Sequence, residues 1–196
     1  MFRLPIVLLC LLLSTSLCRG QMKDSDRLGI AIEYFQSGKY QEARNILLEL
    51  DKSYTLNPRF RAYLGVCCFY EWDFAKAAEI LDEVIPLLAS LSPQEKSVYN
   101  YAAAESHFTL QHYREALPYF IQTMSLCHPN ERGESYFKLA FCHLSEGDYV
   151  NAYVCLQQSL SYYEQYLDTP AHQSRIRQIE TMLVGAEAQI KRIVNE

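Results

Sequence analysis

Cysteine and histidine, two residue types that bind zinc and copper, recur at related positions of the chain. Cys68, His107 and His143 each stand three residues after a small residue, inside an apolar pattern with helical spacing. Zinc requires ligand atoms at about 2.0–2.3 Å, whereas packed helices lie about 8–10 Å apart, so three helices would have to converge on one ion. We favour core packing for these side chains and keep a metal site as the alternative.

The sequence lacks the common catalytic motifs. It has no glycine-rich phosphate loop, no G-x-S-x-G turn and no H-E-x-x-H helix. His107 and His112 are five residues apart, which does not place them on one helix face. The carboxylates are scattered along expected helices, where solvation accounts for them. The formal net charge of −5, without a basic stripe, argues against nucleic-acid binding. The sequence thus predicts no enzyme, no cofactor and no nucleic-acid partner.

The elements that would position these residues come from a repeated phrase. An aromatic residue is followed three positions later by alanine in GKYQEA (38–43), WDFAKA (72–77), QHYREA (111–116) and GDYVNA (147–152). A small residue, such as Gly65 before Ala77, stands about twelve positions before each alanine. Two antiparallel helices approach closely where side chains are small. The pattern therefore predicts four helical hairpins, which bury their apolar faces by stacking on one another.

This arrangement resembles the tetratricopeptide repeat, a helix–turn–helix unit of 34 residues. The resemblance covers roughly residues 24–166, with Gly38 and Gly147 at two turns and Trp72 and Gln111 replacing glycine at the other two. It implies an all-α, right-handed solenoid with repeats at 24–57, 58–91, 97–130 and 133–166. Residues 170–194 have apolar side chains at helical spacing and predict a C-terminal helix that caps the last repeat.

The resemblance also implies a concave groove lined by the first helix of each hairpin. The groove positions that it implies, called the predicted groove below, are Leu28, Ile32, Phe35, Val66, Phe69, Tyr70, Tyr101, Glu105, Phe108, Phe137 and Phe141. They are mostly apolar or aromatic, and such surfaces usually mark interfaces. We expect a non-catalytic adaptor that binds a peptide or helix of another protein.

Two alternatives to partner binding remain open at this stage. The groove could be filled by the protein itself, through its C-terminal helix or a second copy in a homo-oligomer. The chain could also be the extracytoplasmic input module of a larger membrane-bound regulator.

Residues 1–20 have the composition of a secretory signal peptide. Arg3 precedes an apolar run from Leu4 to Leu13, and small residues follow. Cleavage before Gln21 is our first interpretation, and acylation of Cys18 as a lipoprotein is the second. No later stretch is apolar enough to predict a membrane span in the mature chain. We expect an exported protein, periplasmic in preference to secreted or membrane-anchored.

Five cysteines follow the signal sequence, and an odd number leaves at least one thiol unpaired within the chain. Most are expected to be small buried core residues. One disulfide, between Cys142 and Cys155 on paired helices, is the alternative prediction.

Overall fold

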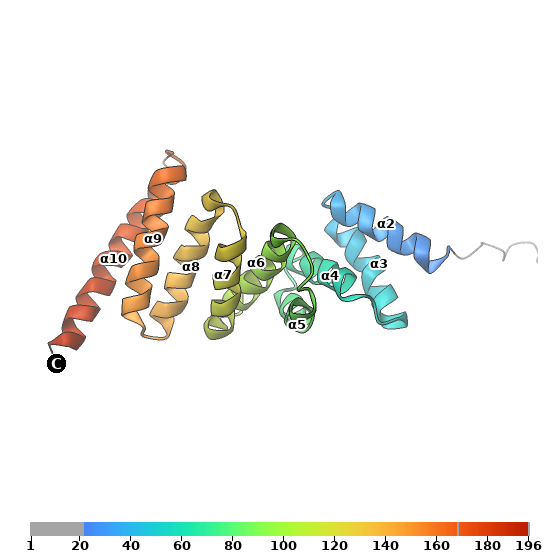
Figure 1. Cartoon of the computed structure of the whole chain (residues 1–196), viewed down its shortest axis with the longest axis horizontal. Coiled ribbons are helices and arrows are strands. Elements are labelled where there is room, and N and C mark those ends of the chain that lie inside the picture. Colours follow the sequence, from blue (N-terminus) through green and yellow to red (C-terminus); the bar gives the residue numbers. More distant parts are fainter. Residues whose placement is uncertain (1–21, 168, 196) are drawn as a thin grey trace, which may run out of the picture.

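The computed structural model describes residues 22–167 and 169–195, and within these ranges the protein is entirely helical (Figure 1). The α-helices are α2 (Asp24–Gln36), α3 (Tyr40–Ser53), α4 (Pro58–Tyr70), α5 (Phe74–Val84), α6 (Pro93–Thr109), α7 (Tyr113–Leu126), α8 (Arg132–Ser145), α9 (Tyr149–Tyr166) and α10 (Gln173–Val194). Two 3₁₀ turns, η1 (Ile85–Leu87) and η2 (Pro129–Glu131), lie in the linkers. The hairpins α2–α3, α4–α5, α6–α7 and α8–α9 follow one another along an elongated array. The predicted all-α solenoid is confirmed.

All four hairpins turn through the same backbone motif. Gly38, Trp72, Gln111 and Gly147 have φ of 72°, 64°, 62° and 74°. The amide of the residue after each one donates to a carbonyl five residues back, as Asp73 does to Cys68 at 2.9 Å. This is the Schellman pattern, which satisfies carbonyls at the end of a helix. The repeated phrase therefore begins with a helix stop and continues into the second helix of the hairpin.

Small residues lie where the helices of each hairpin touch. The four recurring alanines and the small residues before them are fully buried or, for Gly65, in the buried class. A Cβ atom placed on Gly65 would lie 2.8 Å from Leu81 Cγ. The absence of a side chain at Gly65 thus permits close packing of α4 against α5.

Several helices begin at a residue whose side chain caps the first turn. Asn57, Asp73, Ser92 and Asp148 each accept a backbone N–H in the first turn of the following helix. Ser92 caps α6, and Pro93 occupies the first helical position, where no intrahelical hydrogen bond needs its missing N–H. The Glu95 carboxylate binds Arg59 and the Tyr99 hydroxyl, so it joins α6 to α4.

The C-terminal helix closes the end of the array. Ile176, Ile179 and Ala186 of α10 are buried where the helix packs along α9. Arg175 in its first turn reaches α8. Of the two roles left open for this helix, α10 takes the capping position after α9, where its apolar stripe packs, and does not lie along α2, α4 and α6.

Candidate functional site

The predicted groove is only partly open. Tyr70, Tyr101 and Phe141 are exposed, at 47%, 36% and 39% of their full surface. Leu28, Ile32, Phe35, Phe69 and Phe108 are half-buried. Val66, Glu105 and Phe137 are buried and present almost no surface.

Contacts between successive first helices explain this burial. Phe35 of α2 stacks on Tyr63 of α4 with ring centroids 4.3 Å apart. Phe69 of α4 meets the edge of Tyr101 of α6 at 6.3 Å, and Phe108 of α6 meets Phe141 of α8 at 5.5 Å. Much of the aromatic surface that helical phase assigned to a groove therefore joins one repeat to the next.

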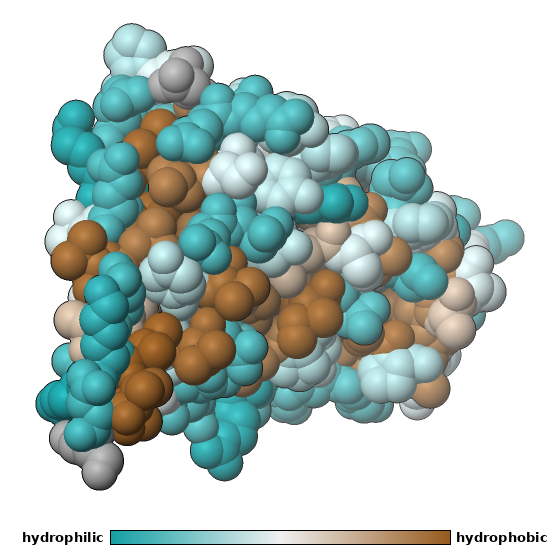
Figure 2. All heavy atoms as spheres, turned by 60° about the vertical axis from the view of Figure 1, so that its left-hand side comes forward, coloured by the Kyte–Doolittle hydropathy of each residue, from teal (hydrophilic) through white to brown (hydrophobic). Residues whose placement is uncertain are grey.

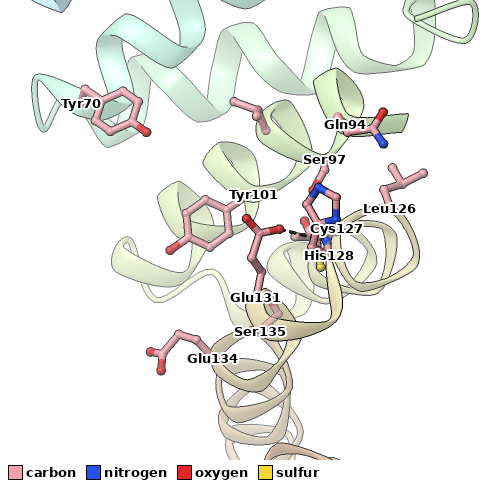
Figure 3. A pocket seen from close by; sticks show the side chains of 12 residues that line it. Tyr70, Gln94, Ser97, Tyr101, Leu126, Cys127, His128, Glu131, Glu134 and Ser135 are labelled. Atoms are coloured by element: carbon pink, nitrogen blue, oxygen red, sulfur yellow. Dashed lines mark hydrogen bonds between the residues drawn. The ribbon is translucent and has the colours of Figure 1, made fainter. Parts of the chain in front are cut away.

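A pocket of about 400 Å³ opens beside the exposed rings (Figure 3). It is lined by Tyr70 of α4, by Gln94, Ser97, Val98 and Tyr101 of α6, by Thr123, Leu126, Cys127 and His128 at the end of α7 and beyond, and by Glu131, Glu134 and Ser135 around the start of α8. Its Tyr70 and Tyr101 belong to the predicted groove. The same helical phase also points Val98 of α6 and Glu134 of α8 toward the groove, and Gln94 and Ser97 continue the face of Tyr101.

The linker between α7 and α8 shapes one wall of the pocket. Glu131 at the end of η2 accepts the His128 backbone N–H at 3.0 Å, which closes the turn. Its side chain projects into the pocket, toward the side on which Tyr101 lies (Figure 3). Glu134, one turn further on, accepts the Tyr163 hydroxyl at 2.6 Å and pairs with Arg175 at 3.0 Å.

Carboxylates dominate the electrostatics around Tyr101. Burial raises the pKa of the Tyr101 hydroxyl, and the charges of Glu105 and Glu134 raise it further. Burial also raises the pKa of Glu105, against the opposing effect of its ion pair with Lys138. The ammonium of Lys138 lies 5.4 Å from the ring centroid of Phe108. Each of these two carboxylates is paired with a cation, Glu105 with Lys138 and Glu134 with Arg175.

The cysteine and histidine positions lie on separate helices and have separate partners. His107 Nε2 lies 2.9 Å from an Asp82 oxygen, and His143 Nδ1 lies 3.1 Å from Asp148. Cys68 is buried in the core cluster that extends from α2 to α6. Within the described ranges, no three His, Cys, Asp or Glu side chains are grouped as metal ligands would be.

The five cysteines of the described chain are buried free thiols. The structure thus does not form the predicted Cys142–Cys155 disulfide. Burial raises the pKa of Cys67 and Cys142 to about 12 and that of Cys155 to about 11. These thiols remain protonated at neutral pH and pack as small apolar side chains.

Apolar side chains also reach the surface outside the pocket. They form an interrupted band on the side seen with the C-terminal end of the array turned forward (Figure 2). Val150 and Val154 of α9 and Val184 of α10 are among the exposed apolar residues. None of the helices that the structure describes combines the length and apolar character needed to cross a membrane. The predicted signal peptide and Cys18 lie outside the described residues.

The fold defines this chain as a helical-repeat protein with tetratricopeptide-like hairpins. Its shape is similar to solved structures of MamA. MamA from Desulfovibrio magneticus RS-1 aligns over 89% of this chain and 95% of its own, with a TM-score of 0.60 and 14% identity. A MamA mutant aligns over 86% and 84%, with a TM-score of 0.66 and 13% identity. Another MamA structure gives a TM-score of 0.58 and 16% identity over 88% and 90%. Searches with family models and against curated proteins gave no match.

Proposed function

We propose that the protein is a non-catalytic interaction module that binds a segment of another protein across Tyr70, Tyr101 and Phe141. The observation that carries this proposal is the pocket of about 400 Å³ that Tyr70 and Tyr101 line; the exposed ring of Phe141 lies outside its lining. A hollow with apolar walls and a few polar groups is the usual form of a binding site. Tyrosine side chains favour such sites because each has an apolar ring and a polar end.

The face of the array also suits an extended or helical peptide. The exposed rings come from α4, α6 and α8, so a bound segment would contact three successive hairpins. Segments of this kind bind through apolar anchor residues placed in grooves. The rings are held by edge contacts with Phe69 and Phe108, which reduces the loss of side-chain entropy on binding.

Export is part of the proposal and rests on the composition of residues 1–20. The exported chain would act in the periplasm, with attachment through acylated Cys18 or secretion as the alternatives. Mass spectrometry of the N-terminus of the purified protein distinguishes cleavage before Gln21 from lipid on Cys18.

Affinity purification from cells that naturally express the protein tests the binding surface. The variant Tyr70→Ser/Phe141→Ser removes two exposed rings and leaves the buried core in place. The matched control is Val150→Ser/Val154→Ser, which removes two exposed apolar side chains of α9. We expect a co-purified protein to be lost with the first variant and kept with the second.

The same experiment separates the proposal from self-association. Equal recovery of the co-purified protein with both variants overturns binding at the exposed rings. Light scattering of the purified chain gives its oligomeric state. A homo-oligomer that dissociates on Tyr70→Ser/Phe141→Ser, with no other protein recovered, would instead assign the surface to a second copy.

A further inference from the structure

We propose that the pocket receives an arginine or lysine side chain from an extended segment of the partner. This inference rests on the proposed function and specifies the chemistry of the segment. The charge and the shape of the pocket walls favour a basic peptide over other occupants.

The charged side chains that line the pocket are carboxylates. Glu131 and Glu134 lie on one wall, and neither lysine nor arginine is among the lining residues. The lining also includes the imidazole of His128. An acidic occupant would therefore meet like charge, whereas a cation would meet opposite charge.

Of the two carboxylates, Glu131 is the one that forms no ion pair with the described residues. Glu134 already pairs with Arg175 and accepts the Tyr163 hydroxyl. Glu131 accepts only the His128 backbone N–H, and no ion pair to it is formed by the described residues. A guanidinium or ammonium group in the pocket could bind the Glu131 carboxylate without breaking a salt bridge of the protein.

The other walls suit the remainder of a long basic side chain. Val98 and Leu126 provide apolar surface for its methylene stem. Tyr70 and Tyr101 provide aromatic rings, to which a cation is attracted.

A purely aliphatic anchor fits the same walls less well. It would remove water from Glu131 and from the Ser97 hydroxyl without giving either a partner. Burying a carboxylate without a partner is costly. The pocket should therefore discriminate by charge among side chains of similar length.

Immobilised arrays of nine-residue peptides test this discrimination. The peptides are acetylated and amidated, so that no terminal charge contributes, and matched sets differ only at the central residue. That residue is arginine, lysine, citrulline, norleucine or glutamate, with aromatic and aliphatic residues varied around it. We expect the arginine or lysine sets to bind at least tenfold more of the protein than the citrulline and norleucine sets do. The glutamate set should bind the least protein.

The protein variants are chosen to preserve the wall. Glu131→Gln removes the charge and keeps an oxygen that can accept the His128 N–H. It should reduce the preference for a cation at least fivefold. Glu164→Gln, on an exposed part of α9, is the charge-matched control and should leave the preference unchanged. Equal binding of the arginine and citrulline sets, or an unchanged preference in Glu131→Gln, overturns the inference.

The array also separates this inference from the proposed function. If all peptide sets bind equally and lose binding with Tyr70→Ser/Phe141→Ser, the surface binds peptides and the inferred charge preference is wrong. If no peptide set binds the wild-type protein more strongly than it binds Tyr70→Ser/Phe141→Ser, the proposed function and the inferred charge preference are both wrong.

Discussion

Four residues at the hairpin turns adopt positive φ, and two of them are not glycine. Gly38 and Gly147 reach this conformation without steric cost. Trp72 and Gln111 adopt it with side chains attached, at a cost of about 1–2 kcal/mol each. Trp72 is 80% exposed, so burial of its indole does not offset that cost. The four hydrogen-bonded turns impose the conformation despite the residue type.

Replacing these two residues with glycine should therefore stabilise the protein. We expect Trp72→Gly and Gln111→Gly each to raise the free energy of unfolding by about 0.5–1 kcal/mol, since glycine also loses more entropy on folding. Urea denaturation followed by circular dichroism measures the change. Gly147→Ala is the converse control and should lower stability by about 1 kcal/mol. A loss of stability in both glycine variants would contradict this account of the turns.

The N-terminus of α9 depends on one carboxylate. Asp148 accepts the Asn151 backbone N–H at 3.1 Å and its side-chain amide at 2.7 Å. These bonds, the Asn151 side chain first and then its backbone and His143, lower the pKa of Asp148 below its usual 3.8. Because the folded-state pKa is depressed, the ionised carboxylate contributes stability above the unfolded-state pKa, and this contribution is lost as the pH falls through the folded-state pKa.

We expect Asp148→Ala to lower the free energy of unfolding by about 1 kcal/mol at neutral pH. Asp148→Asn keeps an oxygen acceptor and should lower the free energy of unfolding by only a few tenths of a kcal/mol. The advantage of the wild type over Asp148→Ala should shrink below about pH 4. Urea titrations of the three proteins at several pH values measure these differences. A gap between wild type and Asp148→Ala that stays constant into acid would refute the role of the charge.

Helix pairs in this protein touch where side chains are missing. Leu81 of α5 is fully buried against Gly65 of α4, and a Cβ on Gly65 would also lie 2.9 Å from Leu81 Cδ2. By contrast, a Cβ on Gly185 of α10 would have no atom within 4 Å. The two glycines share a helical conformation and differ in their surroundings.

Gly65→Ala should thus lower the free energy of unfolding by about 1–3 kcal/mol through overpacking. Gly185→Ala should instead raise it by up to about 1 kcal/mol, since alanine is the better helix former. Gly65→Ala/Leu81→Val should recover part of the loss because the shorter side chain makes room. Thermal and urea unfolding of the three variants measure this. Stabilisation by Gly65→Ala would show that α4 and α5 are not in close contact there.

The helical spacing of residues predicted the positions of the hairpins better than it predicted which side chains line the groove. The alanine pattern located the hairpins because each alanine must face the partner helix of its own hairpin. This holds however strongly the array of hairpins curves. The same phase assigned Val66 and Phe137 to a groove, but both are buried. Phe137 is covered by Arg175 of α10, whose guanidinium lies 4.0 Å from the ring centroid. Such contacts depend on elements distant in sequence, which local spacing does not encode.

The pocket was harder to predict than the exposed rings. Tyr70 and Tyr101 follow from their helical phase, whereas His128 and Glu131 belong to a linker whose path is set by η2. A short 3₁₀ turn has no periodicity to detect. The carboxylate that gives the pocket its charge is therefore visible only in three dimensions.

Across the whole molecule, the hairpins share one continuous interior. One core cluster extends from α2 to α6 and another from α6 to α10, and Tyr119 of α7 packs against both. Its hydroxyl donates to Asp82 at 2.7 Å, and its ring stacks on His107. Repeats that contact only their neighbours behave as a linear array. The first helices therefore keep a fixed order, and their exposed rings form one surface.

The most direct test of this surface is site-specific photocrosslinking in cells that naturally express the protein. Benzoylphenylalanine is placed at Val98 in the pocket or at Val154 on α9, which are 47% and 49% exposed. We expect a covalent adduct with another protein from position 98 and none from position 154. An adduct from position 154 alone, or only adducts with a second copy of this chain from position 98, would contradict this expectation.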